Sequence, residues 1–259
     1  MSGSFVFHGI DNKVGTTMVA VSVAEALASI FPEKKVLFLA LNGRESTEYV
    51  REEAESIDSL KSRLESRMLG EEELKAHCRN VRNLFLLGGV GNEEEERYYQ
   101  PELASRMIEL AGKSFDFTVI DSGNRLDNGL AFGALTAGTE RYFLLTQQET
   151  LLSRWEKRRP LYENLGITPK AFIINNYMEN DIYPLEYVAR RIGADKDEFH
   201  KVAFSYEGRR AEIEHKTLRR DAGGAFAQDI VRLTESLVGG APERDARQKR
   251  RKLPWKSFI

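Results

Sequence analysis

The sequence has little cysteine and little histidine. Its 259 residues include one cysteine, Cys78, and four histidines that are scattered along the chain. A single cysteine excludes an internal disulfide and a Cys-x-x-Cys metal site, and the histidine spacing does not suggest a metal cluster. We therefore expect a protein of a reducing compartment without a structural metal, with Cys78 as a buried structural thiol and not a nucleophile.

Long apolar runs are also missing. No stretch approaches the ~20 apolar residues that a membrane-spanning helix needs. The N-terminal segment, MSGSFVFHGIDN, lacks a basic region followed by a long apolar one, as a secretion signal would have. We therefore expect a cytoplasmic protein.

The chain carries no large excess of charge of either sign. It has 38 basic and 40 acidic residues, a formal net charge of −2, so overall charge does not favour nucleic acid as a partner. The segment from Glu243 to Ile259 differs, because it has seven basic residues against two acidic ones, together with Leu253, Trp255 and Phe258. Three interpretations of this basic tail stay open: a solubilising tail, a peptide that docks on a protein partner or a second subunit, and a segment for a membrane surface or nucleic acid.

Short β-rich runs alternate with helical patterns along the rest of the chain. The runs include SFVFH, KKVLFLAL, FDFTVID, RYFLLT and KAFIINN, and several are apolar at successive positions. Strands of that kind are covered by helices on both faces of a mainly parallel sheet. We predict an α/β, doubly wound fold with about seven strands, a single domain over residues 1–239 and the basic tail over 240–259. The spacing of apolar residues from Val50 to Met68 predicts a helix there.

The first strand leads into a glycine loop. Gly15 opens a predicted helix whose first turn contains Thr16 and Thr17. Free backbone N–H groups and the helix dipole favour a phosphate at such a point, and a threonine hydroxyl can reach a phosphate-bound Mg²⁺. The motif GxxxxGK[ST] is not satisfied, because Thr16 stands at the lysine position. A strand-to-helix turn without a ligand is therefore the alternative interpretation.

Residues 11–18, DNKVGTTM, resemble the deviant P-loop KGGVGKTT of the MinD/ParA ATPases. Within that superfamily the chain looks most similar to the CpaE/TadZ-like branch, which has a degenerate Walker A motif. FDFTVID resembles the switch II strand, FIINN the strand that ends near the adenine, and VAFSYEG the segment that flanks the base. The resemblance implies a P-loop NTPase fold, a bound ATP or ADP with Mg²⁺, and a homodimer.

The resemblance also implies site residues. Those for the nucleotide are Asn12, Lys13, Val14, Gly15, Thr16, Thr17, Asn175, Asn176, Ser205 and Tyr206. Those for Mg²⁺ are Thr17 and Asp121, directly or through water. Asp121 has an alternative interpretation as a turn or helix-capping residue, because Ser122, Gly123 and Asn124 follow it.

Departures from the family pattern concern catalysis. The signature lysine is Asp11 here, the P-loop lysine is Thr16, and the carboxylates after the second strand are Ala40 and Asn42. Phosphoryl transfer depends on positioned charge and metal, so we predict at most a slow ATPase. The expected function is a nucleotide-binding localisation or assembly factor, recruited to a membrane or cell pole. The alternatives are an active ATPase that uses Lys13, with Lys13 and Asp121 as its catalytic candidates, and a nucleotide-free scaffold.

Overall fold

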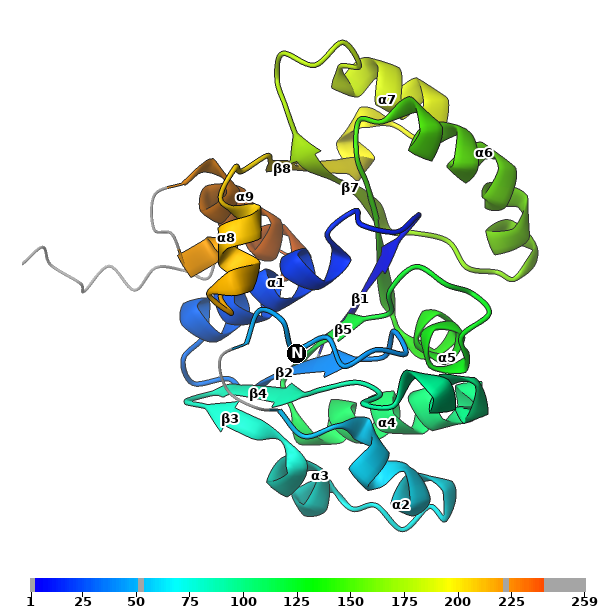
Figure 1. Ribbon diagram of the computed structural model, residues 1–259, viewed down its shortest axis with the longest axis vertical. Helices are drawn as coiled ribbons and strands as arrows, with labels where there is room; N and C mark the ends of the chain where they lie inside the picture. The colour runs from blue at the N-terminus through cyan, green and yellow to red at the C-terminus, as the bar shows by residue number, and fades with distance from the viewer. Residues whose placement is uncertain (1–2, 51–53, 221–223, 240–259) are drawn as a thin grey trace, which may run out of the picture.

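In the computed structural model, which describes residues 3–50, 54–220 and 224–239, eight strands form one sheet (Figure 1). Their order across the sheet is β3-β4-β2-β5-β1-β6-β7-β8. All neighbouring strands run parallel except β3 and β4, which are antiparallel. The strands in chain order are β1 (Gly3–Gly9), β2 (Val36–Ala40), β3 (Arg79–Val81), β4 (Leu84–Leu87), β5 (Phe117–Asp121), β6 (Glu140–Leu145), β7 (Ala171–Tyr177) and β8 (Phe199–Ala203).

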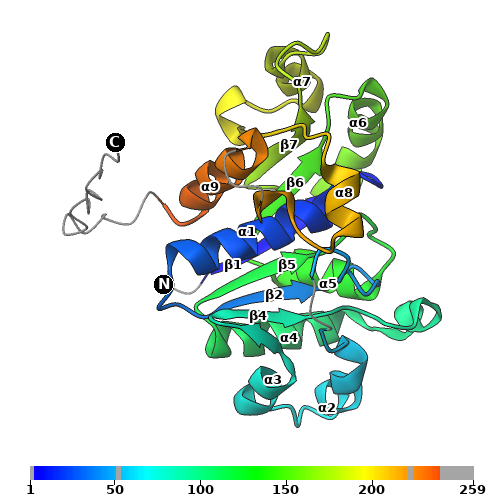
Figure 2. The ribbon, with the colours of Figure 1, turned by 60° about the vertical axis from the view of Figure 1, so that its left-hand side comes forward.

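Helices cover both faces of the sheet, with α1 and α9 on one face and α4, α5 and α6 on the other (Figure 2). The α-helices are α1 (Thr16–Ile30), α2 (Lys61–Glu65), α3 (Glu71–His77), α4 (Pro101–Ser114), α5 (Gly129–Ala137), α6 (Glu149–Asn164), α7 (Leu185–Ile192), α8 (Gly208–Ile213) and α9 (Ala225–Leu237). The 3₁₀ turns are η1 (Ile57–Leu60), η2 (Glu93–Tyr98), η3 (Lys196–Glu198) and η4 (Leu218–Arg220). The predicted α/β fold with a mainly parallel sheet is confirmed.

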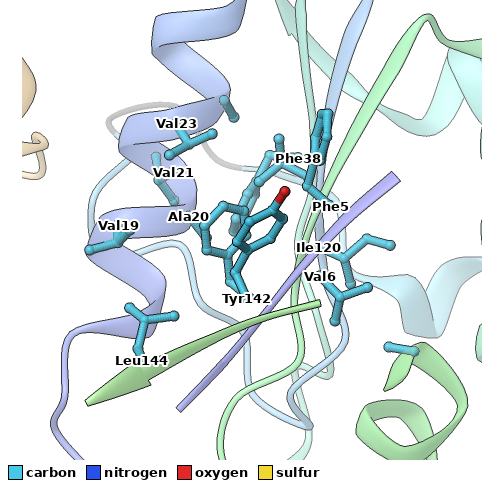
Figure 3. Packing of buried hydrophobic residues seen from close by; sticks show 14 of the residues in the cluster. Phe5, Val6, Val19, Ala20, Val21, Val23, Phe38, Ile120, Tyr142 and Leu144 are labelled. Atoms are coloured by element: carbon cyan, nitrogen blue, oxygen red, sulfur yellow. The ribbon is translucent and has the colours of Figure 1, made fainter. Parts of the chain in front are cut away.

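The core lies between α1 and the central strands. Val19 and Val23 of α1 and Phe38 of β2 belong to this buried cluster, whereas Val6 of β1 and Ile120 of β5, also buried, point to the opposite face of the sheet (Figure 3). Burial of one such side chain stabilises the fold by roughly 1.5–3 kcal/mol. The apolar runs thus hold the N-terminal end of α1 at the edge of the sheet where β1 and β5 end.

Two local predictions differ from the structure. Strand β3 was not among the predicted strands, because three exposed residues leave no hydrophobic pattern. The helix predicted from Val50 to Met68 is shorter than predicted and begins only at Ile57. Among its described residues, only η1 and α2 are helical, since the backbone before Ile57 instead bonds to the end of β4, with Ile57 N donating to Gly88 O at 3.0 Å.

Two further predictions from the sequence concern Cys78 and the basic tail. Cys78 is buried, as predicted, and burial raises the pKa of its thiol to about 12, which disfavours the reactive thiolate. The basic tail, residues 240–259, lies outside the described residues, so its role stays a prediction. Within the described part of the chain, no helix combines the length and the apolar character that crossing a membrane requires.

Strand β1 lies at the centre of the sheet, between β5 and β6. Helix α1 leads from it toward β2 on one side, whereas α5 leads across it from β5 to β6 on the other. Open α/β sheets bind ligands at the carboxyl ends of strands at such a reversal. The loop between Gly9 and Thr16 lies there.

Candidate functional site

The loop after β1 ends in a left-handed glycine. Gly15 is the N-cap of α1, with φ 86° and ψ 28°, a conformation that glycine adopts without strain. A Cβ at this position would overlap the side-chain nitrogen of Asn175. No side chain caps α1 and its first turn has no acidic residue, so the free N–H groups and the positive end of the helix dipole face outward.

Asn175, from the end of β7, holds the loop from the other side. Its Nδ2 donates to Val14 O at 2.8 Å, and the residue is 3% exposed. Its Oδ1 is buried beside Gly15 without a hydrogen-bond partner among the described residues. Buried polar atoms are rarely left unpaired, so this inaccessible oxygen is an exception in the described part of the chain.

Asp121 lies at the carboxyl end of β5, next to the first turn of α1. Its Oδ2 accepts from Thr17 Oγ1 at 2.6 Å and from Asn42 Nδ2 at 3.0 Å, and its Oδ1 accepts from Gly123 N at 2.9 Å. Burial raises the pKa of Asp121 to about 6, against the lowering effect of these hydrogen bonds. The carboxylate is therefore mostly ionised at neutral pH, as a cation ligand must be.

Two cavities meet at the loop. A cavity of about 280 Å³ is lined by the loop, by the residues after β2 and by those after β5, among them Thr16, Thr17, Asn42 and Gly123. A larger cavity of about 690 Å³ is lined by Asn175, Asn176 and the segment from Phe204 to Arg209. Lys13, Gly15, Met18, Tyr49 and Glu212 line both, so one groove runs across the N-terminus of α1.

The groove carries charges of both signs. Lys13, Arg44 and Arg125 line the smaller cavity, but so do Glu48 and Glu212. Burial, and to a lesser degree the negative charges of Glu212 and Glu48, raise the pKa of the Tyr49 hydroxyl to about 12. The groove is therefore not a uniformly positive site.

Asp11 is held by an arginine of the same chain. Arg154, on α6, forms an ion pair with Asp11 Oδ2, and Asn12 N donates to Asp11 Oδ1 at 2.8 Å. One helical turn later, Arg158 donates to Ile10 O at 3.0 Å. The negative charge that the sequence places at the signature-lysine position is thus compensated by Arg154, which the sequence analysis did not identify.

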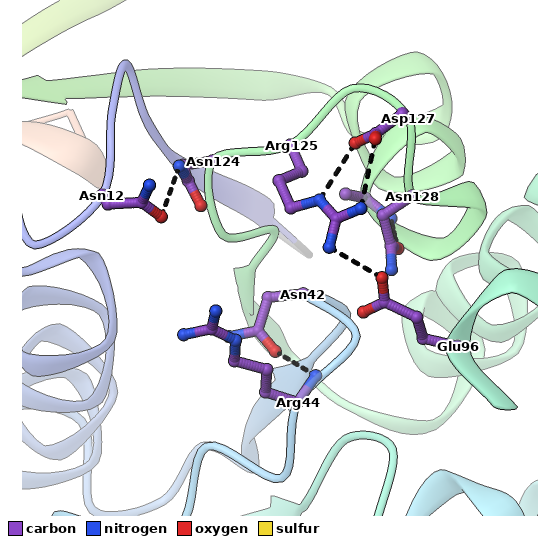
Figure 4. A network of polar contacts seen from close by, with 9 residues as sticks. Asn12, Asn42, Arg44, Glu96, Asn124, Arg125, Asp127 and Asn128 are labelled. Atoms are coloured by element: carbon purple, nitrogen blue, oxygen red, sulfur yellow. Dashed lines mark hydrogen bonds and ion pairs between the residues drawn. The ribbon is translucent and has the colours of Figure 1, made fainter. Parts of the chain in front are cut away.

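Polar side chains also tie together the loops that surround the smaller cavity (Figure 4). Asn124 Nδ2 donates to Asn12 Oδ1 at 3.0 Å, which joins the loop after β5 to the glycine loop. Arg125 bonds to Glu96 Oε1 at 2.8 Å and to Asp127 Oδ1 at 3.0 Å. Glu96 belongs to the acidic run 93–96, which is a 3₁₀ turn beside the site.

No family model matches the sequence, and no curated protein matches it significantly. Solved structures do share its architecture. A ParA family ATPase from Chlorobium tepidum TLS superposes with a TM-score of 0.79 at 16% identity, over 90% of this chain and 97% of that one. MinD from Pyrococcus horikoshii OT3, complexed with Mg-ADP, gives 0.73 at 18% identity, over 92% and 96%. An ATP complex of a variant McdA from Cyanothece gives 0.67 at 14% identity, over 92% and 97%.

The chain has the fold of the ParA and MinD ATPases. At these identities the likeness establishes the fold, so the site must be judged from this chain's own residues.

The structure brings the predicted nucleotide-site residues to one groove. Asn12, Lys13, Gly15, Thr16 and Thr17 line the smaller cavity, and Val14 is buried beneath the loop. Asn176, Ser205 and Tyr206 line the larger one, where Tyr206 is 89% exposed and its ring contacts that of Phe204. Asn175 donates to Val14 O and is almost fully buried, so little of its side chain is accessible to a base.

Three residues at the site were missed from the sequence. Arg154 is remote in the chain and carries no motif, so no local signal could have found it. Arg44 follows the predicted strand end at Asn42 by two residues, and Arg125 follows Asp121 by four. Both lie at carboxyl ends of parallel strands, a position that could have marked them as candidates.

The residues present fit a nucleotide and a magnesium ion in part. Free N–H groups at α1 and the cavity volumes suit a phosphate and an attached base. In the described residues, no cluster of three or more His, Cys, Asp or Glu residues could hold a metal, and the predicted Mg²⁺ residues Thr17 and Asp121 are hydrogen-bonded to each other. Mg²⁺ commonly binds through one or two carboxylates plus phosphates and water, which is compatible with this small set.

Proposed function

We propose that this chain is a nucleotide-binding localisation or assembly factor of the ParA/MinD type, closest to the CpaE/TadZ-like branch, with weak or absent ATP hydrolysis. One observation carries the proposal. The left-handed Gly15 directs the uncapped N-terminus of α1 into the groove, beside the Thr17–Asp121 hydrogen bond of 2.6 Å. Anions bind where helix N–H groups are free, and a hydroxyl paired with a carboxylate suits a phosphate-bound cation.

Each protein group has a defined task in this proposal. The N–H groups at the start of α1 bind phosphate oxygens, and Thr17 and Asp121 hold Mg²⁺. When bound, Mg²⁺ neutralises phosphate charge. Asn176, Ser205 and Tyr206 contact the base from the larger cavity, while Asn175 fixes the loop through its hydrogen bond to Val14 O.

Weak hydrolysis follows from the residues that surround the phosphates. Thr16 and Asp11 replace two lysines of the family pattern, and Ala40 and Asn42 replace two carboxylates. Asn42 carries a neutral amide, which cannot act as a base toward water, and it donates to Asp121. Arg154 compensates the negative charge of Asp11, and its own charge is therefore already paired within the chain.

Calorimetric titration with Mg-ATP and Mg-ADP tests the binding site. We expect both to bind, and Gly15→Ala to abolish binding because the added Cβ would meet Asn175 at a residue with φ 86°. Gly166→Ala is the matched control, since Gly166 also has a positive φ, 67°, but no atom lies within 4 Å of an added Cβ. Absence of wild-type binding at millimolar nucleotide would leave the scaffold interpretation, and unchanged binding in Gly15→Ala would place the nucleotide elsewhere.

Self-association and recruitment are the remaining parts of the proposal. We propose a homodimer that responds weakly to nucleotide, and docking of a protein partner or membrane surface through the basic tail. Sedimentation of the full chain and of a chain ending at Gly239, each with and without Mg-ATP, tests the first part. Strong ATP-driven dimerisation that survives removal of the tail would contradict it.

A further inference from the structure

Three cationic side chains line the smaller cavity, and they differ in what they contact. Arg125 is held by Glu96 and Asp127. For Lys13 and Arg44, no hydrogen bond or ion pair of the side chain is formed with any residue that the structure describes. Figure 4 shows the Arg44 guanidinium directed away from the Glu96–Arg125–Asp127 group. Arg44 is thus an exposed cation at the cavity that forms no ion pair with a carboxylate of the described residues.

The backbone of Arg44 is fixed even though its side chain is free. Arg44 N donates to Asn42 Oδ1 at 3.0 Å, and Asn42 Nδ2 donates both to Asp121 Oδ2 at 3.0 Å and to Ser46 Oγ at 2.5 Å. The segment that follows β4 also contacts this backbone, because Gly89 N donates to Glu45 O at 3.0 Å. Any side chain at Gly89 would overlap the Arg44 carbonyl oxygen, so the loop packs directly on this backbone.

Asn42 connects Arg44 to the groups proposed to hold Mg²⁺. The same Asp121 oxygen accepts from Asn42 and from Thr17. If Thr17 and Asp121 hold a nucleotide-bound Mg²⁺, as proposed above, they would place the outer phosphates at this end of the groove. Arg44 is linked to that pair through the hydrogen bonds of Asn42. The larger cavity, with its aromatic residues, lies on the other side of Gly15.

The P-loop itself offers little side-chain charge at this point. Position 16 is threonine, and Asp11 is already paired with Arg154. A guanidinium is the side chain best suited to bind a terminal phosphate, because its planar donors can bond two oxygens at once.

We propose that Arg44 binds the terminal phosphate of a nucleoside triphosphate and so makes the site discriminate ATP from ADP. The inference rests on the proposed nucleotide function and adds a specificity residue to it. Arg44 replaces neither Thr17 nor Asp121; it adds a guanidinium to the single positive charge, Lys13, that the glycine loop brings to the smaller cavity.

Calorimetric titration of the full chain with Mg-AMPPNP, a non-hydrolysable triphosphate, and with Mg-ADP tests the proposal. A charge-assisted hydrogen bond contributes enough that Arg44→Gln should weaken AMPPNP binding about 10- to 100-fold. ADP binding should change less than about 3-fold, since its phosphates do not reach Arg44. Arg44→Lys should retain part of the preference, because it keeps the charge without the planar donors.

Arg82→Gln is the matched control, because Arg82 is an exposed arginine in the turn between β3 and β4, away from the groove. It should leave both affinities unchanged. Thermal unfolding checks that Arg44→Gln folds as the wild type does, as expected for an exposed side chain. Equal affinities in Arg44→Gln and wild type, or equal losses for AMPPNP and ADP, would overturn the assignment of Arg44. A wild type that binds neither nucleotide would overturn the proposed function, and this inference with it.

Discussion

The ion pair between Asp11 and Arg154 should stabilise the glycine loop. We expect removal of the Arg154 side chain to destabilise the fold more than removal of the Asp11 charge. The Asp11 side chain is 5% exposed and that of Arg154 is 57% exposed. Arg154→Ala therefore leaves a buried carboxylate with the N–H of Asn12 as its remaining hydrogen bond, whereas Asp11→Asn returns an exposed guanidinium to water at little cost.

The expected magnitude is moderate. Two unit charges at ~4 Å interact by about 1–4 kcal/mol at effective dielectric constants of 80 to 20. Exposure of Arg154 to solvent screens this interaction toward the lower end, so we expect Arg154→Ala to cost about 1–2 kcal/mol. We expect Asp11→Asn to cost less than about 1 kcal/mol, and the double variant to resemble Asp11→Asn.

Urea unfolding of the wild type, both single variants and the double variant measures the coupling. Arg158→Ala serves as the control, since Arg158 lies one turn along α6 and donates to the neutral carbonyl of Ile10. It should not couple with Asp11→Asn. Strictly additive single effects for Asp11 and Arg154, or a larger cost for Asp11→Asn than for Arg154→Ala, would refute the reasoning.

Three further predictions concern turnover, Lys13 and His8. Phosphate release from Mg-ATP should be slow, because each missing charge contact can lower the rate by ~10²–10³; fast release that Lys13→Met abolishes would show an active ATPase that uses Lys13. Lys13 has φ 58°, so Lys13→Gly should raise stability to urea by up to about 1 kcal/mol, whereas Lys13→Met should not. If the Lys13 charge contributes to binding, both variants should weaken nucleotide affinity equally in calorimetry. Burial lowers the pKa of His8 from 6.5 to about 3, so the unfolded chain takes up a proton below pH 6.5 that the folded chain does not, and stability falls as the pH falls. At pH 5 this costs about 2 kcal/mol relative to pH 7, and urea unfolding of His8→Gln should show a pH dependence smaller by that amount; identical slopes would contradict a neutral His8.

The hydrogen bonds of His8 show why it stays neutral. Ser122 Oγ donates to Phe7 O at 3.0 Å, so it accepts from His8 Nδ1 at 3.0 Å. His8 Nε2 is then the acceptor for the Tyr162 hydroxyl at 2.9 Å. A second proton, on Nε2, would remove the acceptor of the Tyr162 hydroxyl and place a charge in a fully buried position.

Much of the fold could be predicted from the sequence. The apolar runs around Leu37, Val119 and Leu144 lie in buried parallel strands, because burial on both faces requires apolar residues at successive positions. The spacing between Val50 and Met68 misled, since a helical period shows which residues can share a face but not whether the backbone has other hydrogen-bond partners. Those partners, at the end of β4, come from a distant part of the chain.

The position of the glycine loop was determined by the sequence alone. A strand, a short loop and Gly15 before an apolar helix form a local unit, and the left-handed conformation of Gly15 depends on its lack of a Cβ. The placement of Thr17 in the first turn follows from the same local geometry. Residues close in sequence need no long-range contact to be positioned relative to one another.

Only the tertiary structure decided which distant side chains meet this loop. Arg154 and Asp11 are 143 residues apart, and Asn175 and Val14 are 161 apart, yet each pair is in contact. Sheet order and helix packing set these distances, and neither leaves a pattern in the sequence next to Asp11 or Val14. The physical reason is that ion pairs and hydrogen bonds act over a few ångströms in space, whereas a single sequence shows only separation along the chain.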